Sequence, residues 1–216
     1  MQWRELGRLP NLLSLSRIAL APLVVYFVQR SYAGSVFTAG ALYVFAGITD
    51  GLDGYLARRM KCVTPLGTAL DPVADKIFAI FLVIGLILFR EFPLWLAALV
   101  IGRDILIVAG GSLLLRGRAG LILPSNLTGK WAFASLAVLL GAHVIKFNFS
   151  IALMTPIVAF LLIASLINYG RLFLKARHGE IVEPFRDRPA WRAIRLSLAG
   201  IVAAAHLLMF WVEFLR

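Results

Sequence analysis

The sequence DGLDGYLARRMKCVTPLGTALDPVAD, from Asp50 to Asp75, holds four of the eleven acidic residues of this 216-residue chain. Asp50 and Asp53 are spaced i,i+3, and Asp71 and Asp75 are spaced i,i+4. At these spacings the side chains of each pair share one face of a helix. The basic, proline-containing stretch 58–65 lies between the pairs and predicts a turn. We therefore expect an antiparallel helical hairpin that gathers four carboxylates at one end.

Both arms of this hairpin continue into long apolar segments. The chain is 61% hydrophobic and 15% charged, whereas soluble domains carry about 25% charged residues. A membrane-spanning helix needs about 20 apolar residues. The apolar segments cover residues 9–29, 35–57, 66–89, 93–115, 127–147 and 150–174, with a weaker one at 194–214. Because apolar residues come in blocks and do not alternate, a β-barrel is excluded. The sequence predicts an all-α polytopic membrane protein, a six-helix bundle with an extra C-terminal hydrophobic helix.

The distribution of positive charge predicts the orientation. The net charge is +11, but the apolar segments exclude a soluble nucleic-acid-binding protein. With the N-terminus inside, the predicted inner segments hold fifteen Lys and Arg residues and the outer ends of the first six spans hold three. Cytoplasmic loops carry such an excess. We therefore expect the N-terminus, the acidic turn and the polar connection 176–193 to be cytoplasmic, and the first apolar segment to be a retained span.

Four carboxylates beside hydrocarbon require a counter-charge or raised pKa values, since an ionised acid inside a membrane carries a large free-energy cost. Oxygen ligands favour a hard cation, Mg²⁺ or Mn²⁺, and four acids suit a site for two ions that acts in phosphoryl transfer. The three histidines and single cysteine show no zinc-ligand spacing. The alternative is a solvated ion network with the neighbouring basic residues Arg58, Arg59, Lys61 and Lys76.

The acidic stretch resembles the signature of the CDP-alcohol phosphotransferases, D-x2-D-G-x2-A-R-x8-G-x3-D-x3-D. Every specified position matches, at Asp50, Asp53, Gly54, Ala57, Arg58, Gly67, Asp71 and Asp75. The resemblance covers residues 9–175. It implies six transmembrane helices, an active site facing the cytoplasm and a homodimer. We expect residues 1–178 to form the family's membrane domain, and residues 179–216 to form a cytoplasmic connection and the C-terminal hydrophobic helix.

The resemblance also implies the chemistry and the residues that perform it. A phosphatidyl group passes from CDP-diacylglycerol to an acceptor hydroxyl, and CMP leaves. The four aspartates surround two metal ions, with Asp75 also the general base. By the same resemblance, Gly54, Ala57 and Gly67 accommodate the cytidine and Arg58 reaches the diphosphate.

The N-terminal stretch from Pro10 to Arg17 is similar to the start of bacterial and mitochondrial phosphatidyltransferases. Asn11 and Arg17 are therefore candidates for contacts to the donor phosphates. For Arg17 the alternative is a side chain that extends to the inner membrane surface.

Three further basic residues, Arg103, Lys130 and Arg171, are candidates for binding a phosphate on the acceptor. Charged residues inside spans usually face the bundle interior or a watery cavity. The alternatives are positive-inside anchoring for Lys130 and Arg171, and an internal ion pair for Arg103 with Asp104.

Two acceptors compete in the interpretation. Gly129-Lys130 resembles the branch of the family that uses glycerol 3-phosphate, and Arg103-Asp104 resembles the branch that uses phosphatidylglycerol, which would give cardiolipin. Inositol phosphate also remains open. From another class, an ion-coupled transporter would use the acids as a cation site, but such sites usually lie at repeat interfaces near the bilayer midplane. The leading hypothesis is transfer to glycerol 3-phosphate in a bacterial inner membrane.

Overall fold

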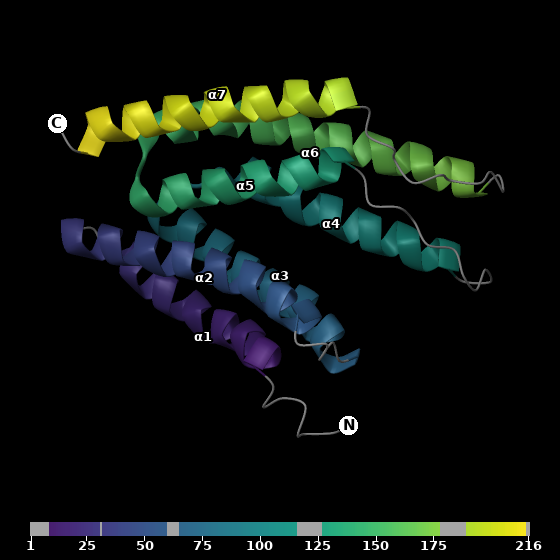
Figure 1. Cartoon of the computed structure of the whole chain (residues 1–216), viewed down its shortest axis with the longest axis horizontal. Coiled ribbons are helices and arrows are strands. Elements are labelled where there is room, and N and C mark those ends of the chain that lie inside the picture. Colours follow the sequence, from purple (N-terminus) through teal and green to yellow (C-terminus); the bar gives the residue numbers. More distant parts are fainter. Residues whose placement is uncertain (1–8, 31, 60–64, 116–126, 178–188, 215–216) are drawn as a thin grey trace. The chain divides into compact units, whose positions relative to one another are not determined.

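The computed structural model describes residues 9–30, 32–59, 65–115, 127–177 and 189–214. Within the helices, the side chains of residues 9–11, 53–58, 65–72, 111–115, 177, 189–196 and 198 lie outside this description. Over the described ranges the chain forms seven α-helices and no strand (Figure 1). The helices are α1 (Leu9–Gln29), α2 (Ala33–Arg59), α3 (Pro65–Phe89), α4 (Leu94–Leu115), α5 (Leu127–Ile145), α6 (Asn148–Arg177) and α7 (Pro189–Phe214).

The first six helices confirm the predicted apolar segments, with ends within three residues of the expected positions. The predicted surface connection at 176–193 is too long, because α6 continues to Arg177 and α7 already begins at Pro189. A proline at the first position of a helix loses no intrahelical hydrogen bond, and its fixed φ suits the helix. Pro189 therefore starts a helix where the sequence analysis expected a loop.

The helices are those of a polytopic membrane protein. In the described part of the chain, four stretches are long and apolar enough to cross a bilayer: Leu12–Gln29, Ala33–Leu52, Leu127–Ile145 and Asn148–Ala176. Large apolar side chains on them face outward, including Phe37 at 79% exposure and Phe160 at 71%. The spans at 66–89 and 93–115 remain predictions, since part of each helix lacks described side chains. The apolar part of α7, Ala199–Phe214, is shorter.

The chain divides into two compact units, and the first contains α1, α2 and α3 together with residues 140–146. In this unit α1 packs against both α2 and α3. Ala21, Val24 and Val28 form the buried face of α1. At Gly85 in α3, an added Cβ would lie 2.7 Å from a methyl carbon of Val25. The glycine therefore permits the close approach of α1 and α3.

The second unit comprises residues 94–139 and 147–216, in which α6 contacts both α4 and α7. Contacts at the start of α6 hold α7. The backbone N–H of Asn148 donates to Glu213 Oε1 at 3.2 Å, and the Ser150 hydroxyl lies 2.9 Å from His206 Nε2. Glu213 thus satisfies a backbone donor of the first helical turn, where a negative charge also complements the helix dipole. The predicted boundary at residue 178 stays a prediction.

These contacts predict that α7 crosses the membrane and ends on the outer side. Glu213 lies beside Asn148, at the end of α6 that the charge distribution places outside. We expect a Leu215→Cys variant in a Cys62→Ser background to react with a membrane-impermeant maleimide in intact spheroplasts. Wild-type Cys62, in the predicted cytoplasmic turn, should react only after permeabilisation. Labelling of the cysteine at position 215 from the cytoplasmic side alone would contradict the span.

Candidate active site

The four aspartates lie on two helices, as the spacing predicts. Asp50 and Asp53 are in the last three turns of α2, and Asp71 and Asp75 are in the first three turns of α3. The connecting residues 60–64 and the side chains of Asp53 and Asp71 lie outside the described part. Five predicted donor-binding residues also lie outside the described surroundings: Asn11, Gly54, Ala57, Arg58 and Gly67. The structure therefore places Asp50 and Asp75 with their side chains, and the others by helix only.

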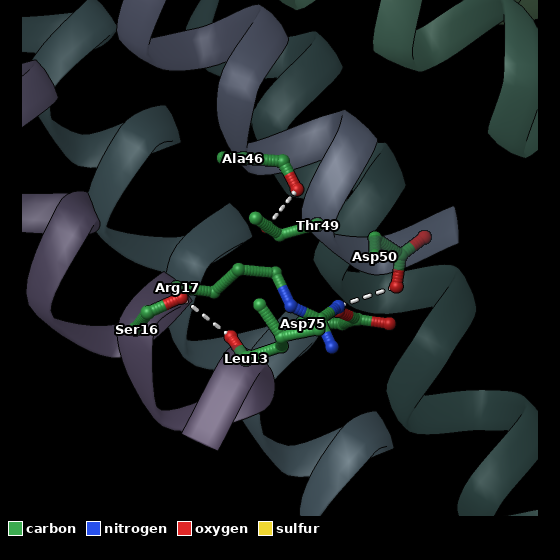
Figure 2. Close-up of polar contacts among 7 residues, drawn as sticks. All are labelled: Leu13, Ser16, Arg17, Ala46, Thr49, Asp50 and Asp75. Atoms are coloured by element: carbon green, nitrogen blue, oxygen red, sulfur yellow. Dashed lines mark hydrogen bonds and ion pairs between the residues drawn. The ribbon is translucent and has the colours of Figure 1, made fainter. Parts of the chain in front are cut away.

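Arg17 of α1 joins the two described aspartates. Its guanidinium Nη1 donates to Asp50 Oδ1 and to Asp75 Oδ1, so residues from three helices meet at one nitrogen (Figure 2). The Arg17 side chain is only 2% exposed, whereas the Asp50 and Asp75 side chains are 47% and 36% exposed. The positive charge is therefore buried, and the two carboxylates extend from it toward the surface of the unit.

The local sequence of α1 explains why Arg17 lies in the interior. Ser14, Arg17, Ala21 and Val24 recur at helical spacing, and all four are buried. The neighbouring Ser16 hydroxyl donates to Leu13 O at 2.7 Å within the same helix. On α2, the buried Thr49 hydroxyl donates to Ala46 O at 2.8 Å. These hydroxyl groups are satisfied by their own helices, and Arg17 makes the connection between helices.

This pairing corrects part of the sequence analysis. A buried Arg17 does not extend to the membrane surface, which disfavours that alternative. The described ion pairs of Asp50 and Asp75 are with Arg17, which was not among the basic residues of the alternative ion network. The signal was present in the sequence, since Arg17 interrupts an apolar span and intramembrane charges usually pair with one another. The sequence did not show which acids it would meet.

The two described carboxylates supply ligands of the kind that a divalent metal ion prefers. Carboxylate oxygens of Asp50 and Asp75 converge on one positive centre, and oxygen-only ligands suit Mg²⁺ or Mn²⁺. Among the described residues no three His, Cys, Asp or Glu side chains form a metal-binding group. The set predicted for the metal needs Asp53 and Asp71 in addition, and their side chains are outside the description.

A second polar cluster lies in the other unit, around Arg103 of α4. Its Nη1 donates to Asp104 Oδ1 at 2.8 Å, and its Nη2 donates to the Ser165 hydroxyl of α6 at 3.0 Å. The guanidinium also lies 5.9 Å from the ring centroid of Tyr169. Gly129 of α5 completes the cluster, because a Cβ there would be 3.0 Å from Arg103 Nη2. The internal ion pair considered for Arg103 is therefore present, within a site formed by three helices.

Lys130 and Arg171 lie close in sequence to this cluster but differ from Arg103 in exposure. Lys130 follows Gly129 and Arg171 is two residues after Tyr169, and both side chains are exposed. Arg103 is largely buried, at 14% exposure. One residue before Gly129, the Thr128 hydroxyl accepts from Asn168 Nδ2 at 3.1 Å, which links α5 to α6. Sequence reasoning missed Ser165, Asn168 and Tyr169, because uncharged polar residues in a span carry no distinctive pattern.

The fold and the acidic site together define an α-helical membrane protein with converging carboxylates at the ends of two helices. The chain belongs to the CDP-alcohol phosphatidyltransferase family, whose model matches residues 8–173. Members of this family in general depend on divalent metal ions. The match ends before α7, which begins at Pro189.

Curated relatives carry two kinds of name. A CDP-diacylglycerol–glycerol-3-phosphate 3-phosphatidyltransferase of Aquifex aeolicus is 41% identical over 50% of this chain and 60% of its own length. A cardiolipin synthase (CMP-forming) of Streptomyces coelicolor is 37% identical over 46% of this chain and 48% of its own. A cardiolipin synthase (CMP-forming)/mitochondrial hydrolase fusion protein of Schizosaccharomyces pombe is 43% identical over 49% of this chain and 17% of its own. The chain thus spans 60% or less of each.

The cluster around Arg103 gives a test of packing. Gly129→Ala places a Cβ 3.0 Å from Arg103 Nη2 and 3.3 Å from Ser165 Oγ, whereas a Cβ at Gly102 would meet nothing within 4 Å. Both changes have the same effect on helix propensity, so overpacking should make Gly129→Ala less stable than Gly102→Ala by about 1–3 kcal/mol. Thermal unfolding of the detergent-purified variants measures this difference. Equal stability would show that Arg103 is not packed against Gly129.

Proposed function

We propose that the chain is a metal-dependent phosphatidyltransferase that uses CDP-diacylglycerol as donor and glycerol 3-phosphate as acceptor. The observation that carries the proposal is the convergence of Asp50 and Asp75 on one positive centre, from the two helices that hold the family signature. Family membership supports phosphatidyl transfer, and the Aquifex aeolicus relative is named for transfer to glycerol 3-phosphate. CMP and phosphatidylglycerophosphate would be the products.

The donor would bind around the acidic hairpin. Asp50, Asp53, Asp71 and Asp75 would hold two Mg²⁺ or Mn²⁺ ions. When bound, these ions would neutralise the charge of the diphosphate and of the leaving oxygen. The small residues Gly54, Ala57 and Gly67 would leave space for the cytidine, and Asn11, Arg17 and Arg58 would contact the diphosphate. The acyl chains of such a donor are apolar and its nucleotide is water-soluble, which fits a site at the end of membrane helices.

The chemical step assigned to the protein is a proton transfer. The acceptor hydroxyl oxygen attacks the phosphorus that carries the diacylglycerol. The bond from this phosphorus to the oxygen shared with CMP breaks, and CMP leaves with the electron pair. Asp75 takes the hydroxyl proton as general base. Its carboxylate is partly exposed. A general base needs such exposure in order to reach a substrate that enters from solution.

The acceptor site would be the cluster around Arg103, with Lys130 and Arg171 as exposed basic residues from α5 and α6. Glycerol 3-phosphate carries a terminal phosphate of about −1.5 to −2 charge near neutral pH, as phosphorylated side chains do. Several converging donors are needed to bind such a group. Phosphatidylglycerol, the acceptor of a cardiolipin synthase, is the second candidate, because the sequence Arg103-Asp104 resembles the cardiolipin branch of the family. An inositol phosphate would use the same basic residues.

The cellular setting completes the proposal. The enzyme would be a homodimer in a bacterial inner membrane, with its active site facing the cytoplasm. The positive-inside distribution of Lys and Arg supports this orientation. An ion-coupled transporter is the alternative class, and release of CMP from CDP-diacylglycerol by the purified chain separates the enzyme from a carrier.

The general-base assignment predicts a specific defect. Asp75→Asn should lower kcat by about 10²-fold or more, since general-base catalysis contributes about 10²–10⁴-fold. CDP-diacylglycerol should still bind in the presence of Mn²⁺. Changing Asp50 to Asn should instead weaken metal dependence and donor binding together. Glu91→Gln, which alters a carboxylate just after α3 and outside the site, serves as the control and should leave turnover unchanged. Near-normal turnover in Asp75→Asn would refute the assignment.

The acceptor assignment is tested with the purified chain, CDP-diacylglycerol and a panel of acceptors, read by lipid mass spectrometry. Lys130→Ala and Arg171→Ala should each raise the KM for glycerol 3-phosphate about 10–100-fold, because a charge-assisted contact contributes about 1.5–3 kcal/mol. The donor KM should change little. If the wild-type chain ignores glycerol 3-phosphate and converts phosphatidylglycerol to cardiolipin, the second candidate replaces the first.

A further inference from the structure

One nitrogen atom lies where two carboxylates meet. Arg17 Nη1 contacts Oδ1 of Asp50 and Oδ1 of Asp75 (Figure 2). The guanidinium is buried, and both carboxylates are partly exposed. Asp50 and Asp75 are also two of the four residues assigned to the metal ions. The position between these two oxygens suits a cation, and it cannot hold a guanidinium nitrogen and a metal ion at once.

We propose that Arg17 is an internal counter-cation that exchanges with the divalent metal. In the metal-free protein its guanidinium pairs with both Asp50 and Asp75 and offsets part of their negative charge, and a metal ion that binds these carboxylates displaces it. The inference rests on the proposed function for the presence of the metal and adds a role for a residue of α1. It concerns the order in which cations occupy the two carboxylates: first the Arg17 guanidinium, then the metal ion.

Electrostatics gives the reason for such a residue. Without a cation, carboxylates from α2 and α3 would repel each other at the point where the helices are held together by α1. A guanidinium carries a positive charge and presents several N–H donors in one plane. It therefore keeps the acidic hairpin assembled until a metal ion arrives. Because Arg17 is almost fully buried, it comes from within the helix packing and not from a surface loop.

The exchange has two consequences. A metal ion must compete with the resident guanidinium, so its apparent affinity is lowered by the fraction of molecules in which Arg17 occupies the carboxylates. The displaced guanidinium then has N–H groups available for an anionic ligand, and the donor diphosphate is such a ligand. Binding of the metal and of the donor would reinforce each other through Arg17, and this coupling is reciprocal.

The test measures Mn²⁺ binding by the chelator-treated full chain in detergent, without substrate, by electron paramagnetic resonance. Arg17→Gln removes the competitor and should lower the Kd for Mn²⁺ about 10-fold or more, the effect of a guanidinium resident in about 90% of molecules or more. The metal-free Arg17→Gln protein should unfold at a lower temperature than wild type, and Mn²⁺ should raise its Tm by more than it raises that of wild type. Arg30→Gln, the same change just after the other end of α1, should alter neither quantity.

Two further variants keep the outcome decisive. Arg17→Lys retains the charge but not the planar group of donors, and it should also bind Mn²⁺ more tightly than wild type; it carries the test if Arg17→Gln does not fold. Adding Asp50→Asn to Arg17→Gln should abolish the gain in affinity. Unchanged or weaker Mn²⁺ binding in the Arg17 variants overturns the exchange, because Arg17 would then support the metal ligands. CMP release by wild type is measured separately, and its absence contradicts the proposed function even where the Mn²⁺ affinities differ as expected.

Discussion

The buried charge of Arg17 is the constraint on which the first unit depends. A guanidinium at 2% exposure must be paired, and its partners come from the two helices adjacent to α1. Removing one member of a fully buried ion pair costs about 3–5 kcal/mol. The partial exposure of Asp50 and Asp75 reduces that figure here. The helix contacts made possible by Gly85 and the position of the carboxylates are therefore linked, since both require α1 to lie close to α3.

The two polar clusters use arginine in different ways. Arg17 connects acids that lie far apart in sequence, so it assembles three helices around a site of negative charge. Arg103 pairs with the adjacent Asp104 and donates to Ser165 across the helix interface, so its carboxylate partner belongs to its own helix. Under the proposed function, the first arrangement would serve the metal ions, and the second would bind the anionic acceptor.

Much of the fold was predictable because membrane helices are encoded locally. Blocks of apolar residues fixed six helices closely, and the spacing of Asp50 with Asp53 and of Asp71 with Asp75 indicated which faces carry the acids. The start of α7 was misjudged because Pro189 is equally compatible with a loop and with a first helical turn. The pairing of Arg17 and the contact of Arg103 with Ser165 depend on which helices are neighbours. Periodicity within a single segment does not contain that information.

The attachment of α7 has a consequence for how chains of this kind can diversify. The contacts described for this helix involve Phe147, Asn148 and Ser150, which precede or begin α6, and the family match ends well before α7 starts. If the described contacts are its main attachment, such a helix can be gained, lost or replaced with few compensating changes elsewhere. Related chains would then differ at the beginning of α6 according to whether they carry such a helix. Those that do would place a hydrogen-bond donor to its acidic residue where Asn148 stands.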